Sequence, residues 1–319
     1  MRRVYLIILL LFLLAAAGIM IRTGSHHTAP GTREYRKGDE WTDAKAKAHP
    51  AMHYSRVISL APSITEVLFA LGAGDRVVGV TTFCDFPPEA QKREKVGGYY
   101  DTSYEAILSM QPDLVIVLTE HEKQRESLTE MGISLLVVDQ RDTRGILDSI
   151  LTIGRMFGRE TEARTLISDI TARMGGIGKR IRGLPRPRVM ICIGRTIGTG
   201  TIEDVFICGR KGFYHEMLTL AGGVNVYDGP SLQYPAVTGE GITRMNPEVI
   251  IDIIPDLVDL GLNEAEVKRE WHRLKGVDAV KNGRIYVLGD DHVATPGPRF
   301  ILTLEQMARV LHPEVQWDE

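Results

Sequence analysis

The chain has 319 residues, 44% of them hydrophobic and 25% charged, with a formal net charge of −3. This length exceeds one typical domain, and the composition is that of a globular protein with enough apolar residues for two hydrophobic cores. The slightly negative net charge and the lack of a Lys/Arg-rich run argue against nucleic-acid binding. Cys84, Cys192 and Cys208 follow no metal-binding spacing, so we expect buried small side chains and no metal site.

The N-terminal stretch has the pattern of an export signal. Arg2-Arg3 precedes a mostly apolar run, Val4–Ile21, so residues 1–22 are predicted to be a signal peptide or a signal anchor. The length of the run favours an uncleaved anchor in the inner membrane, with the body periplasmic or extracytoplasmic. No cysteine follows directly, which argues against a lipid-anchored lipoprotein. Residues 23–54 are polar and aperiodic and predict a flexible linker.

Residues 55–158 predict a first α/β lobe. The apolar strand Arg56–Leu60 is followed by Ser63–Glu66, which we interpret as a capping box at the start of a helix. This gives Glu66 a structural task, and we do not count it among the site residues. Further short apolar strands alternate with helices, which predicts a parallel sheet. These strands are Val77–Val80, Leu114–Leu118 and Ser134–Val138.

Aromatic loops follow several of the predicted strands. Thr81–Pro88 contains two phenylalanines and two prolines, Gly97–Asp101 contains adjacent tyrosines, and Tyr227–Pro235 contains Tyr234. Open α/β sheets place ligands at the carboxyl ends of their strands. Aromatic side chains there can cover a large flat ligand at low entropic cost.

Residues 159–184 predict one long helix between two lobes. Within it, Thr161–Arg182 would be about 33 Å long at about 1.5 Å per residue. Three glycines near its end weaken a helix, so we expect a kink or fraying at Gly175, Gly176 and Gly178. The apolar face consists of Ala163, Leu166, Ile167, Ile170, Met174, Ile177 and Ile181.

Residues 185–319 predict a second α/β lobe. It begins with the strand Arg188–Ile193 and a glycine-rich loop, Gly194–Gly200. This loop matches neither a Walker sequence nor a dinucleotide fingerprint, and both a ligand-facing loop and a plain tight turn remain open. An amphipathic helix, Arg299–Leu311, closes the lobe.

An internal repeat relates the two lobes. Ser103–Val117 and Thr238–Asp252 align at an offset of 135 residues, which places Glu105 on Glu240. Each copy has a hydroxyl residue as helix cap, a glutamate in the first turn, a short helix that ends near a proline, and a buried strand. A first-turn glutamate is also favoured by the helix dipole alone.

The chain resembles the periplasmic substrate-binding proteins of ABC importers for vitamin B12, ferric siderophores and haem. The resemblance covers residues 56–314, and the loop VGVTTFCDFPPEAQK is most similar to the vitamin B12-binding branch. It implies a non-enzymatic fold of two Rossmann-like α/β lobes, joined by one long helix, with the ligand in the cleft between them. The segments that carry it are RVISLAPSITEVLFALG, VVGVTTFCDFPPEA, SYEAILSMQPDLVI, LAGGVNV, YPAVTGEGITRMNPEVII and LHPE.

The resemblance also implies partners and site residues. Glu105 and Glu240 are expected to dock onto arginines of a dimeric permease, which carries its own ATPase subunits. Two matched carboxylates on similar lobes suit a two-fold symmetric partner. The expected ligand contacts are Phe83, Tyr99 and Tyr234, with Tyr100, Arg195 and Arg299 as secondary candidates.

The ligand itself stays open at this point. The chain has Tyr99 and Tyr234 where the vitamin B12 branch tends to have tryptophan, and Cys84 falls in the expected cleft loop. A tyrosine can ligate haem iron, and His121, His215 or His292 could assist. A corrinoid, a ferric siderophore and haem are therefore all considered.

Two other classes of function are compatible with a two-lobed α/β fold. The fold also occurs in chelatases and nitrogenase-like proteins, but the sequence lacks a nucleophile elbow, HExxH, CxxC or paired carboxylates in one loop, so no enzyme is expected. A membrane-tethered ligand sensor or scavenger without a permease is the other alternative.

Overall fold

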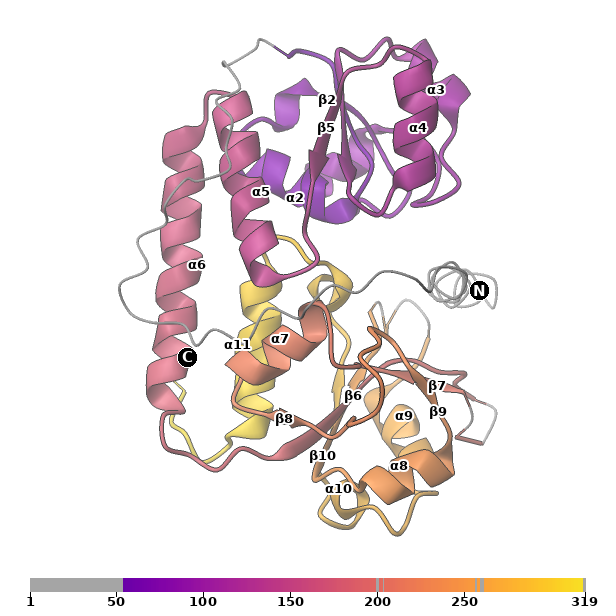
Figure 1. Ribbon diagram of the computed structural model, residues 1–319, viewed down its shortest axis with the longest axis vertical. Helices are drawn as coiled ribbons and strands as arrows, with labels where there is room; N and C mark the ends of the chain where they lie inside the picture. The colour runs from indigo at the N-terminus through magenta and orange to yellow at the C-terminus, as the bar shows by residue number, and fades with distance from the viewer. Residues whose placement is uncertain (1–53, 199–200, 203, 256, 259–260, 318–319) are drawn as a thin grey trace.

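The computed structural model describes residues 54–317 except 199–200, 203, 256 and 259–260. The predictions for residues 1–22 and 23–53 fall outside this range. The described residues form two α/β lobes side by side along one long helix (Figure 1). No helix among them is long and apolar enough to cross a membrane.

The N-terminal lobe contains a five-stranded parallel sheet in the order β3-β2-β1-β4-β5. The central strands β1 and β4 are buried along their whole length, which explains their continuous apolar sequences. The strands are β1 Val57–Ser59, β2 Val77–Val80, β3 Glu94–Lys95, β4 Leu114–Leu118 and β5 Leu135–Val138. The helices are α2 Pro62–Ala70, α3 Tyr104–Ser109, α4 Glu122–Glu130 and α5 Thr143–Met156, with 3₁₀ turns η1 Gly74–Arg76 and η2 Pro88–Lys92.

The C-terminal lobe contains a mixed six-stranded sheet. Its path is β11-β10-β6-β7-β9, and β8 also pairs with β6. β10 is parallel to β6 and β11, whereas β7 is antiparallel to β6 and β9. The strands are β6 Arg188–Gly194, β7 Val205–Ile207, β8 Val224–Asn225, β9 Ala236–Val237, β10 Val249–Ile253 and β11 Ile285–Leu288. The helices are α7 Phe213–Leu220, α8 Gly239–Met245, α9 Glu264–Trp271, α10 Asp278–Lys281 and α11 Phe300–Leu311, with a 3₁₀ turn η3 Asp291–Ala294.

Helix α6, Glu160–Arg180, runs along one side of the molecule from one lobe to the other (Figure 1). The predicted apolar face is confirmed, since all seven of its residues lie in or against one core that both lobes share. The helix continues unbroken to Arg180, so the expected fraying at its glycines does not occur. Ile177 anchors this part in the core, and Arg173 pairs with Glu305 of α11 at 2.8 Å. The lobe boundaries at residues 158/159 and 184/185 stay a prediction.

The start of α2 differs from the sequence-based expectation. Its N-cap is Ala61, Pro62 occupies the first turn, and no side chain caps the helix. The predicted capping box between Ser63 and Glu66 is therefore wrong. Proline fits the first turn because its missing N–H needs no partner there, and this leaves the Glu66 carboxylate for a partner elsewhere.

Candidate functional site

The loops after β3 and β4 bring together a cluster of aromatic and acidic side chains. Tyr99 donates a hydrogen bond from Oη to Oε1 of Glu120 at 3.1 Å. Its ring packs edge-on against Tyr100 at 4.8 Å and His121 at 4.4 Å between centroids. The backbone turn behind this cluster depends on Gly97, which has a φ of 97° and no room for a Cβ beside the carbonyl oxygen of Asp101.

His121 is fully buried beneath these rings. Its Nδ1 accepts a hydrogen bond from the backbone N–H of Leu118 at 3.3 Å. Burial, together with a smaller effect of the Arg125 charge, lowers the pKa of His121 to about 4. The neutral ring therefore carries its proton on Nε2. The lone pair on Nδ1 already accepts the hydrogen bond from Leu118. This arrangement contradicts the expectation that His121 assists as a ligand to haem iron.

Tyr234 approaches the same cluster from the C-terminal lobe. It accepts a hydrogen bond from Nε2 of Gln233 at 3.1 Å. Burial raises the pKa of Tyr234, and Cys208, Glu120 and Tyr100 raise it further. Because the last two belong to the N-terminal lobe, groups of both lobes lie within electrostatic reach of each other here.

The two central tyrosines occupy equivalent positions in the chain. Tyr99 and Tyr234 are separated by the same 135 residues that separate Glu105 from Glu240. Burial raises the pKa of Tyr99 well above its usual value, and Glu120 adds to the rise. Both side chains are therefore neutral phenols at physiological pH.

The loop Thr81–Pro88 contains the third predicted aromatic contact, Phe83, which is half-buried. Its neighbour Cys84 is buried, and its Sγ lies 3.2 Å from Oγ1 of Thr65 and 3.1 Å from Oγ1 of Thr81. Burial raises the pKa of the Cys84 thiol. The expectation that the three cysteines are buried small side chains is confirmed, and Cys84, although it lies in the predicted cleft loop, packs into the core.

Arg299, at the N-cap of α11, bridges the lobes. Its guanidinium donates to Glu66 of α2 at 2.7 Å and to Asp291 at 2.9 Å, and stacks over the ring of Phe86 at 3.7 Å. The side chains of Arg299 and Glu66 are only 16% and 3% exposed. Arg299 is therefore an interlobe anchor whose charge is already paired, which differs from the ligand contact that the sequence suggested.

Arg195 is also placed differently from its prediction. Its side chain is 1% exposed, donates to Asp252 at 3.1 Å and to Glu270, and lies over the ring of Trp271 at 4.9 Å. Trp271 donates in turn to Asp252 at 2.8 Å. Ligand contact by Arg195 is contradicted, because the guanidinium is enclosed in the C-terminal lobe. Glu270 also accepts from the backbone N–H of Gly198 at 2.7 Å, which fixes part of the glycine-rich loop.

The two glutamates of the repeat stand in the first turns of α3 and α8. The predicted helix caps are confirmed: Oγ of Ser103 accepts from the backbone N–H of Ala106 at 3.3 Å, and Oγ1 of Thr238 accepts from that of Gly241 at 3.2 Å. Glu105 and Glu240 are both exposed. Figure 1 shows α3 and α8 on the same side of the molecule, one on each lobe.

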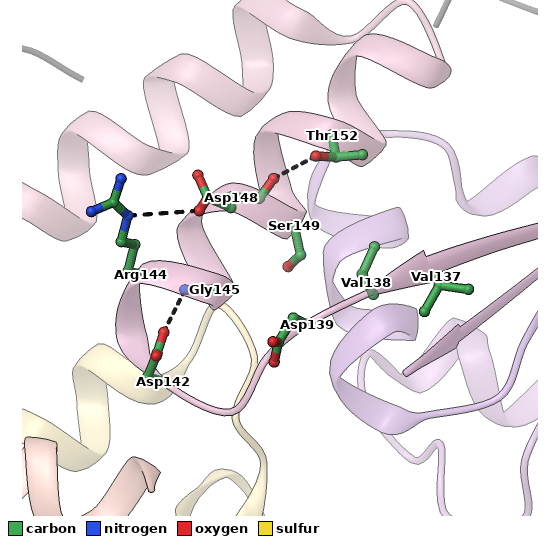
Figure 2. A pocket seen from close by; sticks show the side chains of 9 residues that line it. All are labelled: Val137, Val138, Asp139, Asp142, Arg144, Gly145, Asp148, Ser149 and Thr152. Atoms are coloured by element: carbon green, nitrogen blue, oxygen red, sulfur yellow. Dashed lines mark hydrogen bonds and ion pairs between the residues drawn. The ribbon is translucent and has the colours of Figure 1, made fainter. Parts of the chain in front are cut away.

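A separate pocket lies at the turn between β5 and α5 (Figure 2). Its volume is about 290 Å³, which is below the range of pockets that enclose drug-sized ligands. Figure 2 shows Asp142 capping α5 at Gly145 and Arg144 paired with Asp148 along its rim. The tyrosines are absent from its lining, so this pocket is not the predicted ligand site.

Glu120 is a member of this cluster that the sequence did not indicate. It follows the buried strand β4 directly, and the rule that ligands lie at strand ends could have identified it. Among the described residues, no three His, Cys, Asp or Glu side chains converge to hold a metal ion. What the cluster offers is flat aromatic surface, phenol hydroxyls and one carboxylate.

Comparisons of the sequence and of the structure with known proteins agree on one protein family. The model of the family described as periplasmic binding protein matches residues 57–292. An uncharacterized ABC transporter substrate-binding lipoprotein of Bacillus subtilis is 30% identical over 268 residues, 81% of this chain and 80% of its own. The vitamin B12-binding protein of Salmonella choleraesuis is 27% identical over 258 residues, 80% of this chain and 90% of its own. The structure of a periplasmic haem-binding protein from Pseudomonas aeruginosa has a TM-score of 0.70 at 21% identity, over 82% of this chain and 94% of its own.

Proposed function

The chain belongs to the periplasmic binding protein family, and on that premise we propose that it captures a corrinoid between its lobes and delivers it to an ABC permease. The family consists of non-enzymatic substrate-binding components of ABC importers, in agreement with the lack of a catalytic motif. Three statements go beyond the family assignment and are proposals: the ligand is a corrinoid, the chain contacts a permease, and it is located outside the cytoplasm.

The observation that carries the proposal is the tyrosine pair. Tyr99 and Tyr234 stand at equivalent positions of the two lobes and share the electrostatic influence of Glu120. A flat macrocycle presents two faces, and one aromatic side chain from each lobe could cover both. Tyr100 extends this aromatic surface beside Tyr99, and we propose that the half-buried Phe83 adds to it.

The chemistry of the cluster favours a corrinoid over haem. A tyrosine that ligates iron does so as a phenolate, so iron binding would have to release a proton from Tyr99 or Tyr234, whose pKa values are raised by burial. The lone pair of His121 is engaged by the backbone of Leu118. A corrinoid needs no axial ligand from the protein, because its cobalt can keep axial ligands of its own. The relative named for vitamin B12 supports the same choice.

Haem remains the second candidate, because the haem-binding structure shares this fold and this chain has tyrosines at the cluster. A ferric siderophore is the third candidate.

We further propose that Glu105 and Glu240 dock onto basic residues of the permease. Close charge pairs at protein interfaces couple by about 1.5–7 kcal/mol and fix the orientation of the partner. A tethered sensor would need neither glutamate.

An absorbance and tyrosine/tryptophan fluorescence titration of the purified protein tests the ligand. The probes are cyanocobalamin, haemin and ferrioxamine B. The proposal expects saturable binding of cyanocobalamin with a dissociation constant below about 1 μM, equivalent to about −8 kcal/mol. A Soret shift with haemin and no response to cyanocobalamin would overturn the corrinoid assignment.

A further inference from the structure

Carboxylates outnumber cations among the charged residues that directly follow strands β4 and β5 of the N-terminal sheet. Glu120 follows β4, and Asp139 and Asp142 follow β5 at the turn drawn in Figure 2. Arg141 lies among them, but it donates two hydrogen bonds to Asp139, at 2.8 and 2.5 Å. These four residues together carry a net negative charge. An anionic ligand near these residues would therefore meet repulsion.

Glu120 retains capacity to accept hydrogen bonds from a ligand. Its side chain is exposed, and its two oxygens accept one hydrogen bond each, from Tyr99 at 3.1 Å and from Thr119 at 3.0 Å. A carboxylate offers about four lone-pair positions, so acceptor positions remain. Electrostatic effects on Tyr99, Tyr100 and Tyr234 place the carboxylate close to the aromatic cluster of both lobes.

The two arginines that were expected as secondary ligand contacts are not available to an anionic ligand. Arg195 is enclosed with Asp252 and Glu270, and Arg299 is paired with Glu66 and Asp291.

Two exposed cations, Arg210 and Lys211, lie on the loop before α7. Burial lowers the pKa of His215 and Arg210 lowers it further, which places the Arg210 guanidinium near α7. They could oppose the effect of Glu120 from the C-terminal lobe, and Arg125 could do so from the N-terminal lobe, since its charge lowers the pKa of His121 in the cluster.

We propose that Glu120 is a specificity-determining residue, which selects a metal chelate with uncharged amide donors on its periphery and rejects one with carboxylates there. This rests on the proposed function and assigns a chemical class to its ligand. An amide N–H donating to Glu120 forms a charge-assisted hydrogen bond, whereas a carboxylate at the same place faces a like charge without a donor. Ionised acceptors make hydrogen bonds that contribute about 1.5–3 kcal/mol.

The test compares two probes that differ at one group. The first is cyanocobalamin, and the second is cyanocobalamin in which one peripheral propionamide has been hydrolysed to a carboxylate. Full-length wild type is expected to bind the amide form at least about tenfold more tightly, the ratio that one such hydrogen bond supports. Glu120→Gln should reduce this ratio to about threefold or less, because glutamine removes the charge but keeps the shape. Glu126→Gln, an exposed change on α4, is the matched control and should keep the wild-type ratio.

Each other outcome decides a different point. An unchanged ratio in Glu120→Gln would overturn the role of Glu120 and leave the proposed function standing. Wild type could instead bind the carboxylate form more tightly, with this preference lost in Arg210→Gln. That result would show that the C-terminal lobe sets the charge preference, and it would also overturn the role of Glu120. If wild type binds neither probe, the proposed corrinoid function is overturned, and so is the proposed selection for amide groups by Glu120.

Discussion

Arg299 and Glu66 form a 2.7 Å ion pair across the two lobes, although 233 residues separate them in the chain. A second link lies nearby, where Glu216 of α7 accepts hydrogen bonds from the backbone N–H and the hydroxyl of Thr143, at 2.8 and 2.6 Å. The carboxylate of Glu216, in the C-terminal lobe, therefore accepts from a backbone N–H in the first turn of α5, which has no partner within that helix. With α6 packed into the shared core, these links lead us to expect small lobe movements during ligand capture.

The first prediction concerns this ion pair. Arg299→Ala leaves the buried carboxylate of Glu66 unpaired and should lower the free energy of unfolding by about 3 kcal/mol. Glu66→Ala should cost less, because Arg299 keeps Asp291 as a partner. Urea unfolding followed by tryptophan fluorescence measures both. Negligible losses in both variants would show that the pair contributes no interlobe stability.

The second prediction concerns pH. The unfolded chain protonates His121 below about pH 6.5, whereas the folded protein resists this until about pH 4. Stability should therefore fall as the pH drops between these values, by about 3 kcal/mol in total from this residue. His121→Asn removes the titrating group, so the difference in unfolding free energy between wild type and variant should shrink over this range. A difference independent of pH from 7 to 4 would contradict the assigned burial of His121.

The third prediction uses the glycines of α6. Gly175 and Gly178 are exposed, helical and free of neighbours where a Cβ would stand. Alanine at each should raise the free energy of unfolding by about 0.5–1 kcal/mol, because alanine loses less backbone entropy in a helix. Gly222→Ala is the contrasting control and should destabilise, since Gly222 has a φ of 84° and a Cβ there would meet His312 at 2.5 Å. Thermal unfolding compares the three variants.

Local patterns were sufficient to predict much of this structure. The apolar face of α6, the caps at Ser103 and Thr238, and the buried strand β4 all follow from residues that are close in sequence. The family resemblance points to Tyr99 and Tyr234 as ligand contacts, and this role stays a prediction.

Partners that are distant in sequence explain the errors. Arg195 is buried because Asp252 and Glu270 reach it from other elements, and no local pattern reveals such pairs. The same reason applies to Arg299 and to Glu66, whose spacing from Ser63 imitates a capping box although the helix begins with Pro62. The two-residue strands β8 and β9 are too short to show any period.

The fourth prediction addresses the permease. Glu105→Arg together with Glu240→Arg should abolish ligand uptake in cells that depend on this importer, because both docking charges are reversed. Ligand affinity of the purified variant should stay within about twofold, since neither side chain belongs to the tyrosine cluster. Glu126→Arg, an exposed reversal on α4, is the control and should leave uptake intact. Uptake that survives the double reversal would contradict the docking role and favour a tethered sensor.

The most direct test of the account is the affinity of cyanocobalamin for full-length wild type and for variants of Tyr99 and Tyr234. Tyr99→Ala and Tyr234→Ala should each weaken binding by at least about tenfold, the equivalent of about 1.4 kcal/mol, because each removes one aromatic face. Tyr99→Phe and Tyr234→Phe should stay within about threefold, since the ring remains and no phenolate is required. Unchanged affinity in both alanine variants would contradict the claim that this tyrosine pair holds the ligand between the lobes.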